Sequence, residues 1–262
     1  MSEAEVLVAD FGLLAYGEAR QAQELLRDAR QSEEVPDVLL LLEHPPVYTR
    51  GRRSDPAELP MGQEWYELQG IEVADTDRGG RVTYHGPGQL VAYPIVSLAP
   101  YGGDVHEFVR RMERVMIAAL ADAGVGAGTV TGLTGVWTAG GSAPAPDATA
   151  DSVAADVVAG ALRKIGSIGI HVSRGVTTHG LAVNVNNDLQ PFEWIVPCGI
   201  EGCRMTSLSR ELGAEQDMDA FAAALTERFG EVYERRPVRT PPQELLRGTG
   251  AARQRAAQGA LR

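Results

Sequence analysis

The feature that most constrains the fold is an apolar stretch at residues 38–43, which contains four consecutive leucines. A run this short and this apolar is typical of a strand that is buried in a sheet. Pro45 and Pro46 follow it and force the chain into a loop, because proline fixes φ and lacks an N–H. The fold must therefore place residues 38–43 inside a covered sheet.

Other strands and helices are expected on both sides of this strand. Apolar and β-branched runs predict strands at 6–9, 71–75, 90–98, 130–138, 164–172 and 181–185, the last two joined by a turn at residues 173–175. Helical spacing and composition predict helices at 16–32, 105–124 and 218–229. Because these elements do not alternate regularly, the sequence predicts an α+β fold, a mixed β-sheet flanked by helices.

The length of 262 residues fits one large domain or two small ones. We interpret residues 1–236 as a single domain. Residues 139–160 are rich in Gly, Ala, Pro and Ser, and we expect a flexible insertion there, with a marginal helix beginning near residue 151. Residues 237–262 contain few large apolar side chains, so we expect a flexible C-terminal tail with at most one helical stretch.

The charge and the cysteine content exclude several classes of protein. The formal net charge of −11 argues against nucleic-acid binding, which needs a basic surface. The acidic N-terminus does not resemble a signal peptide, and no apolar run approaches the length of a membrane span. Two cysteines cannot form a disulfide framework in a chain of this size, so we expect a reduced, cytoplasmic protein.

A single lysine stands out, because Lys164 is the only lysine among 24 Lys and Arg residues. Unlike arginine, a desolvated lysine can lose its proton and act as a base. Alternation along a strand would place Lys164 on one face with Gly166, Ile168, Ile170 and Val172, where it would be partly desolvated. Alternatively, Lys164 lies at the start of the strand and extends into water.

Two further stretches have the composition of binding or catalytic segments. Residues 78–89 combine glycines with Arg, Thr, Tyr, His and Gln, which favours a binding loop over an incidental strand–turn–strand. Cys198 lies between Pro197 and Gly199, where its sulfur is uncrowded and nearby N–H groups could face an oxyanion. The alternative for Cys198, which we adopt for Cys203, is a buried small apolar residue. Their spacing lacks a second Cys/His pair, so no metal site is expected.

Together these segments resemble the lipoyl(octanoyl) transferases, the acyl-carrier-dependent branch of the biotin/lipoate protein ligase family. The resemblance extends from Leu39 to about Leu212. Its landmarks, in order, are residues 42–52, Arg78-Gly79-Gly80, residues 83–89, Gly135-Val136-Trp137, Lys164 with Ser167-Ile168-Gly169, His179-Gly180-Leu181-Ala182 with Asn184, and Pro197-Cys198-Gly199. Residues 139–160 are longer than the family pattern leads us to expect.

The resemblance implies a fold, a reaction and a set of site residues. The fold would be the biotin/lipoate protein ligase (class II synthetase-like) catalytic fold. The reaction would transfer an octanoyl or lipoyl group from acyl carrier protein to a lysine of a lipoyl domain, through a thioester on the nucleophile Cys198 with Lys164 as its partner. The implied substrate-binding residues are Arg78, Gly79, Gly80, Arg81, Val82, Thr83, Tyr84, His85, Ser167, Ile168, Gly169, Gly180, Leu181 and Ala182, with His179 and Gln89 in support.

The resemblance also implies the partners and the absence of a cofactor. The donor would be octanoyl-acyl carrier protein, and the acceptors would be lipoyl domains of 2-oxoacid dehydrogenase E2 subunits and the glycine cleavage H protein. No ATP, metal, nucleic acid or membrane is expected, and we expect a monomer. Because such carriers are acidic, we expect a basic docking surface formed by Arg50, Arg52, Arg53 and Arg174.

Two other functions remain possible at this point. An ATP-dependent lipoate or biotin protein ligase would share the fold but would not need a nucleophilic cysteine. A non-catalytic acyl-binding module would not need Lys164 or Cys198.

Overall fold

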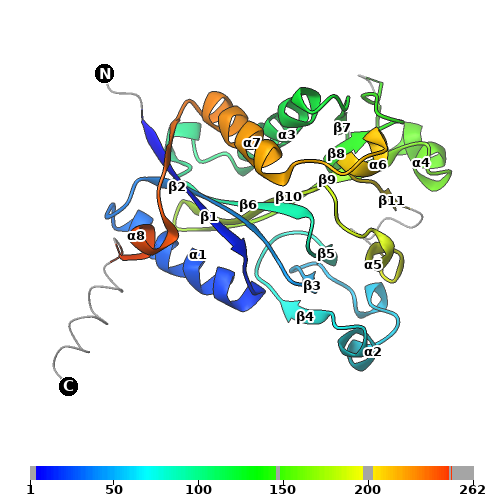
Figure 1. Ribbon diagram of the computed structural model, residues 1–262, viewed down its shortest axis with the longest axis horizontal. Coiled ribbons are helices and arrows are strands. Elements are labelled where there is room, and N and C mark those ends of the chain that lie inside the picture. Colours follow the sequence, from blue (N-terminus) through cyan, green and yellow to red (C-terminus); the bar gives the residue numbers. More distant parts are fainter. Residues whose placement is uncertain (1–3, 146–147, 197–202, 248, 250–262) are drawn as a thin grey trace.

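The computed structural model describes residues 4–145, 148–196, 203–247 and 249. Within these ranges the strands form a nine-stranded mixed sheet and a second sheet of three strands (Figure 1). The large sheet has the order β12-β1-β2-β6-β10-β9-β8-β7, with the short β11 added to β9. Parallel pairs (β1 with β2 and with β12) and antiparallel pairs occur together, so the predicted mixed sheet is confirmed.

The strands of the large sheet have the following bounds: β1 Glu5–Leu13, β2 Asp37–Glu43, β6 Gln89–Ile95, β7 Gly128–Val130, β8 Leu133–Thr138, β9 Arg163–Ser173, β10 Val176–Asn184, β11 Arg204–Met205 and β12 Arg236–Arg239. The small sheet has the order β4-β3-β5, with β3 Val47–Arg50, β4 Glu72–Asp75 and β5 Thr83–His85. The α-helices are α1 Tyr16–Gln31, α2 Gln63–Leu68, α3 Val105–Asp122, α4 Ala150–Val158, α5 Gln190–Glu193, α6 Leu208–Leu212, α7 Met218–Tyr233 and α8 Pro242–Arg247, and 3-10 turns cover Pro56–Glu58 and Ala99–Tyr101.

The leucines of β2 explain how the sheet is covered. Leu39 and Leu41 belong to a core formed with α3 and α7, whereas Leu40 and Leu42 belong to a second core formed with α1 and α8. All four leucines are at most 2% exposed. The helices accordingly lie on both sides of the sheet in Figure 1, with α3 and α7 on one side and α1 and α8 on the other. The prediction of a buried central strand is confirmed.

The small sheet packs through a separate aromatic cluster. Tyr48 and Tyr84 from β3 and β5 contact Tyr66 of α2 and Phe192 of α5. The hydroxyl of Tyr48 donates to the carbonyl of Pro191 at 2.7 Å, and that of Tyr66 donates to the carbonyl of Trp194 at 2.9 Å, so both buried phenols contribute a polar contact as well as apolar area. The loop at 76–82, which joins β4 to β5, contacts β9 of the large sheet.

Two predicted boundaries differ from the structure. Residues 236–239 form β12, which pairs with β1, and α8 packs on β1 and α1, so the predicted flexible tail is wrong for residues 237–247. The predicted strand at 130–138 is two strands, β7 and β8, because the chain turns at Gly132 with φ of +89°. In the 139–160 segment, α4 begins with a capping box between Thr149 and Ser152. The flexibility of that segment stays a prediction. In the described part of the chain, no helix has the length and apolar character needed to cross a membrane.

Candidate active site

A cleft of about 910 Å³ opens where β8 separates from β9. β8 pairs with β9 only as far as Gly166, so the edge of β9 beyond it faces the 78–81 loop instead. The Gly79 N–H donates to the carbonyl of Ile170 at 2.8 Å, which attaches this loop to β9. The other walls are α3, the β7–β8 turn and β10. The volume falls in the range of small-molecule sites.

Most residues that the sequence singled out meet at this cleft. Those that line it are Arg78, Gly79, Gly80, Arg81, Thr83, His85, Lys164, Ser167, Ile168, Gly169, His179, Gly180, Leu181 and Ala182. Val82, Tyr84 and Gln89 do not line it; Val82 and Tyr84 belong to the aromatic cluster, and Gln89 supports the site from behind. Cys198 lies outside the described residues.

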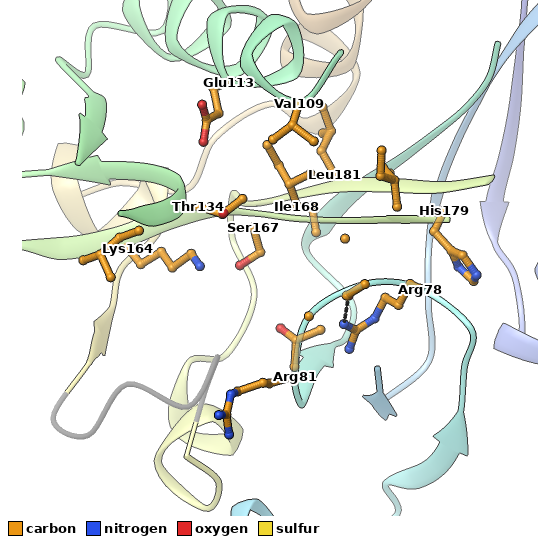
Figure 2. A pocket seen from close by; sticks show the side chains of 18 of the residues that line it. Arg78, Arg81, Val109, Glu113, Thr134, Lys164, Ser167, Ile168, His179 and Leu181 are labelled. Carbon is orange, nitrogen blue, oxygen red and sulfur yellow. Dashed lines mark hydrogen bonds between the residues drawn. The ribbon is translucent and has the colours of Figure 1, made fainter. Parts of the chain in front are cut away.

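A β-bulge determines which way Lys164 points. Gly166 pairs with Val136, whereas Lys164 pairs with Trp137, so Ile165 is an extra residue on β9. Val136 and Trp137 are adjacent on β8, so their side chains point to opposite faces of the sheet. Their partners Gly166 and Lys164 therefore also face opposite sides. Figure 2 shows Lys164 and Ser167 on one side of the strand and Ile168 on the other.

The predicted shared face of Lys164 with Gly166 and Ile168 is therefore wrong. The predicted desolvation is nevertheless present, because Lys164 is only 3% exposed, and the alternative that it extends into water is also wrong. Its Nζ lies 5.4 Å from the centroid of the Trp137 ring, a cation–π distance.

Gly135 of β8 packs directly on the Lys164 side chain. The φ angle of Gly135 is +112°, and a Cβ there would lie 2.7 Å from Lys164 Cε and 2.5 Å from the Gly166 carbonyl oxygen. Only glycine fits this position. Lys164 is therefore held between the backbone of Gly135 and the ring of Trp137.

Arg78 fixes the loop that closes the cleft from the second sheet. Its guanidinium, which is buried, donates to the Thr49 hydroxyl at 2.8 Å and to the Gly79 carbonyl at 3.0 Å. A Cβ on Gly169 would lie 3.0 Å from Arg78 Cδ, so the glycine allows this close approach. Arg81, next in the loop, is paired with the buried Glu58, which also accepts from the Val82 N–H. The loop is thus fixed at both ends by charge-assisted hydrogen bonds.

A chain of buried hydrogen bonds connects His85 to the backbone of Lys164. His85 Nδ1 lies 2.6 Å from Gln89 Oε1, and the Gln89 amide donates to Asn184 at 2.9 Å. The Asn184 amide donates to the Thr206 carbonyl, and the Thr206 N–H donates to the carbonyl of Lys164, both at 2.9 Å. Burial lowers the pKa of His85 to about 3, so its ring is neutral, with the proton on Nδ1 facing the glutamine oxygen.

His179 holds the start of the 76–82 loop, next to Arg78, through Asp77. Its Nε2 lies 2.7 Å from Asp77 Oδ1, and its N–H donates to Gln23 at 2.6 Å. The φ angle of His179 is +56°, in the left-handed region. The hydrogen bond from His179 holds the pKa of Asp77 well below its usual range, whereas burial lowers the pKa of His179. His85 and His179 are therefore both held by hydrogen bonds to other side chains. Within the described ranges, no three His, Cys, Asp or Glu side chains are grouped as metal ligands.

The sequence interpretation missed Glu113, which projects from α3 into the cleft. Its Oε1 accepts the Gly135 N–H at 3.0 Å, and burial raises its pKa. The signal that could have revealed it is its position, because it lies between Met112 and Val115 on the buried face of an amphipathic helix. A carboxylate at such a position needs a partner or a function.

Comparisons with known proteins identify the family of this chain. The family described as the lipoyl protein ligase A/B catalytic domain matches residues 15–230. The chain is 46% identical to the octanoyltransferase of Corynebacterium glutamicum (strain R) over 203 residues, which cover 77% of this chain and 71% of the relative. It is 46% identical to the octanoyltransferase of Mycolicibacterium smegmatis over 218 residues, which cover 83% of this chain and 84% of the relative. It is 42% identical to the octanoyltransferase of Chloroflexus aggregans over 232 residues, which cover 88% of this chain and 96% of the relative.

Solved structures share the fold at low identity. A bipartite lipoate protein ligase from Thermoplasma acidophilum superposes with a TM-score of 0.64 at 16% identity, covering 94% of this chain and 91% of that one. A lipoate-protein ligase A bound with ATP superposes with a TM-score of 0.61 at 16% identity, covering 94% of this chain and 93% of that one. With the sequence motifs, the cleft and these likenesses in agreement, the chain belongs to the lipoyl protein ligase A/B catalytic-domain family.

Proposed function

We propose that this protein is an octanoyltransferase, which moves an octanoyl group from acyl carrier protein to the lysine of a lipoyl domain. The observation that carries the proposal is the buried Lys164 in a cleft whose walls are formed by the family motifs. Relatives that are 40–46% identical over most of the chain bear the name octanoyltransferase. A non-catalytic acyl-binding module would have no use for a lysine held in this way.

In this proposal Cys198 is the nucleophile and Lys164 is its partner. A free thiol has a pKa of about 8.5, and a neighbouring ammonium favours the reactive thiolate. Cys198 attacks the donor thioester, a new C–S bond forms, and the departing pantetheine thiolate takes a proton from Lys164. The acceptor lysine first loses one proton to solvent, and its neutral amine then attacks the enzyme thioester. Lys164 takes one proton from the attacking nitrogen, the C–S bond breaks, and the thiolate of Cys198 is released.

The chain on either side of residues 197–202 supports this pairing. The Val196 N–H donates to the carbonyl of Glu58, whose side chain holds Arg81 at the cleft. Met205 pairs with Lys164 itself through β11 and β9. Val196 and Met205, on either side of residues 197–202, therefore contact residues that hold or form part of the cleft.

The apolar part of the cleft suits a medium-length acyl chain. Val109 of α3, Ile168 of β9 and Leu181 of β10 all line it, and Figure 2 shows them grouped together. Burying about six methylenes at about 0.8 kcal/mol each would stabilise the bound chain by roughly 5 kcal/mol. Because a thioester arrives already activated, the proposed reaction needs neither ATP nor a metal ion.

The acidic carrier and the lipoyl domain need a docking surface on a chain with a net charge of −11. Arg52 and Arg53 are exposed beside the cleft, and Arg53 lines it. Arg50 forms an ion pair with Asp75. Arg174 is hydrogen-bonded to Gln31 of α1 and does not line the cleft. We therefore assign docking chiefly to Arg52 and Arg53.

Intact-mass measurement tests the proposal. The protein is mixed with octanoyl-acyl carrier protein without ATP, and we expect an adduct of one octanoyl group that Cys198→Ser abolishes. Cys203→Ser, which alters the other cysteine, should keep the adduct. No adduct in the wild type, together with octanoylation of a lipoyl domain from free octanoate and ATP, would show a ligase instead.

Lys164→Arg separates charge from proton transfer. Arginine keeps a fixed positive charge but does not give up its proton. We expect a folded variant with nearly no turnover of the acceptor lysine. Turnover close to the wild-type rate would show that no proton passes through residue 164.

A further inference from the structure

Glu113 has a place in the cleft that the proposed reaction does not yet use. Its side chain is 9% exposed. Among the described residues that line the cleft it is the only acidic one, whereas Arg53, Arg78, Arg81, Arg110 and Lys164 are basic. Its neighbours Met112 and Met116 on α3 are buried in the apolar core, whereas Val109 and Arg110, one turn earlier, also line the cleft. A carboxylate at this position is costly to bury unless it acts on one of its neighbours.

Gly135 joins Glu113 to Lys164 physically. On one side the Gly135 N–H donates to Glu113 Oε1 at 3.0 Å, and on the other its Cα faces Lys164, where a Cβ would lie 3.2 Å from Nζ. Since bond lengths put the N and Cβ of a residue no more than about 3 Å apart, the Glu113 oxygen and Lys164 Nζ are separated by at most about 9 Å. The hydrogen bond thus attaches Glu113 to the residue of β8 whose backbone packs on the Lys164 side chain.

The charges of the two residues are also coupled. Burial raises the pKa of Glu113, and the nearby Lys164 and Arg110 oppose that rise. These two cations, from β9 and from α3 itself, are the charged groups that act on the carboxylate, and β8 contributes the Gly135 N–H. Opposite charges attract each other equally, so the same attraction acts on the charged Lys164 side chain.

We propose that Glu113 is a positioning residue for Lys164: it binds the Gly135 backbone that packs on the lysine side chain, and it places a carboxylate within about 9 Å of Lys164 Nζ. The inference rests on the proposed function, in which Lys164 must be charged when the donor thiol leaves and neutral when the acceptor amine attacks. Glu113 therefore acts on the residue whose charge both half-reactions use.

Glu113→Gln separates the two roles, because its amide oxygen can still accept from Gly135 but it carries no charge. Rates of acyl-enzyme formation and of octanoyl transfer to a lipoyl domain are measured separately between pH 6 and 10 by rapid quench and intact mass. In both pH–rate profiles, we expect the part that depends on the charge of Lys164 to move to lower pH by about 0.3 to 1.4 units. This range is the interaction of two charges about 9 Å apart at effective dielectric constants of about 80 to 20. Compared with the wild type, Glu113→Gln should therefore form acyl-enzyme more slowly at high pH and transfer the octanoyl group to the acceptor amine faster at low pH.

Two other variants complete the test. Glu113→Leu removes the hydrogen bond as well, and we expect it to lower the plateau rate at least tenfold as well as to shift the profile. Glu107→Gln, which removes a more exposed carboxylate from the same helix, should leave both profiles unchanged.

Unshifted profiles in Glu113→Gln, or equal slowing of both half-reactions at every pH, would overturn the inference. Failure of the proposed function would be recognised differently, because the wild type itself would then form no acyl-enzyme. Only acyl-enzyme that has formed is counted for the second step, so a misfolded fraction does not contribute to its rate.

Discussion

Replacing Gly135 by alanine tests the claim that Lys164 is held by the β8 backbone. The added Cβ would lie 2.5 Å from the Gly166 carbonyl oxygen and 2.7 Å from Lys164 Cε, closer than such atoms normally approach. Gly166 is paired with Val136 of β8, so a shift of its carbonyl would disturb the pairing of the two strands. The lysine side chain must therefore be displaced, the strands must separate, or both.

The cost of Gly135→Ala has two parts. A left-handed φ costs a residue with a Cβ about 1–2 kcal/mol, and overpacking a buried site costs about 1–3 kcal/mol. We expect the free energy of unfolding to fall by about 2–5 kcal/mol. Gly140→Ala is the matched control, since Gly140 also has a left-handed φ, of +63°, but nothing lies within 4 Å of its added Cβ. It should cost only about 1–2 kcal/mol.

Urea unfolding gives the two free energies, and intact mass after mixing with octanoyl-acyl carrier protein gives the rate of acyl-enzyme formation. In conditions where both variants are folded, Gly135→Ala should form acyl-enzyme at least tenfold more slowly than Gly140→Ala. Equal stability and equal rates in the two variants would refute the role assigned to Gly135.

Three more predictions follow from the site. Charge reversal of Arg52 and Arg53 should raise the apparent Kd for acyl carrier protein in low salt, with a smaller effect in high salt because of screening. Gln89→Leu leaves buried partners unsatisfied, so it should lower the free energy of unfolding by about 1–3 kcal/mol and slow acyl-enzyme formation. Burial lowers the pKa of His44 to about 4 and that of His85 to about 3, so the unfolded chain binds protons below about pH 6.5 that the folded protein does not. Stability should therefore fall as the pH drops from about 6.5 toward 4, by about 1.4 kcal/mol per pH unit for each histidine.

Matched controls exist for each of the three. Arg247→Glu reverses an exposed charge on α8 and should not affect the Kd, whereas an equal effect would refute a local docking surface. Gln63→Leu, at an exposed position of α2, should cost little, and a loss as large as that of Gln89→Leu would contradict the buried network. Replacing the exposed His106 by glutamine should leave the pH dependence unchanged, and stability that is flat between pH 7 and 5 in the wild type would contradict the neutral buried rings.

Much of the fold could be predicted because it depends on local pattern. The leucines of β2 alternate between two apolar cores, so their burial follows from composition alone. The hairpin of β9 and β10 follows from two apolar runs around Arg174 and Gly175, and it is present with the expected turn. The ordered motifs identified the cleft residues, because Gly and polar side chains are concentrated there.

The remaining features depend on long-range contacts that no local pattern encodes. The face of Lys164 is reversed by a bulge that exists only because β8 pairs with β9 out of register. The strand at 236–239 has a sequence typical of a tail, and it is ordered by pairing with β1. Glu113 could not be assigned to the site from sequence, because only the packing of α3 on β8 brings it to Gly135.

The most direct test of the central claim measures whether Lys164 activates Cys198. In a Cys203→Ser background, the rate of alkylation by iodoacetamide is followed against pH with Lys164 present and with Lys164→Met. With the lysine, the midpoint should lie below the value of about 8.5 for a free thiol, and with methionine it should rise by about one unit or more. The same midpoint in both proteins would show that Lys164 does not act on Cys198, and it would contradict the proposed mechanism.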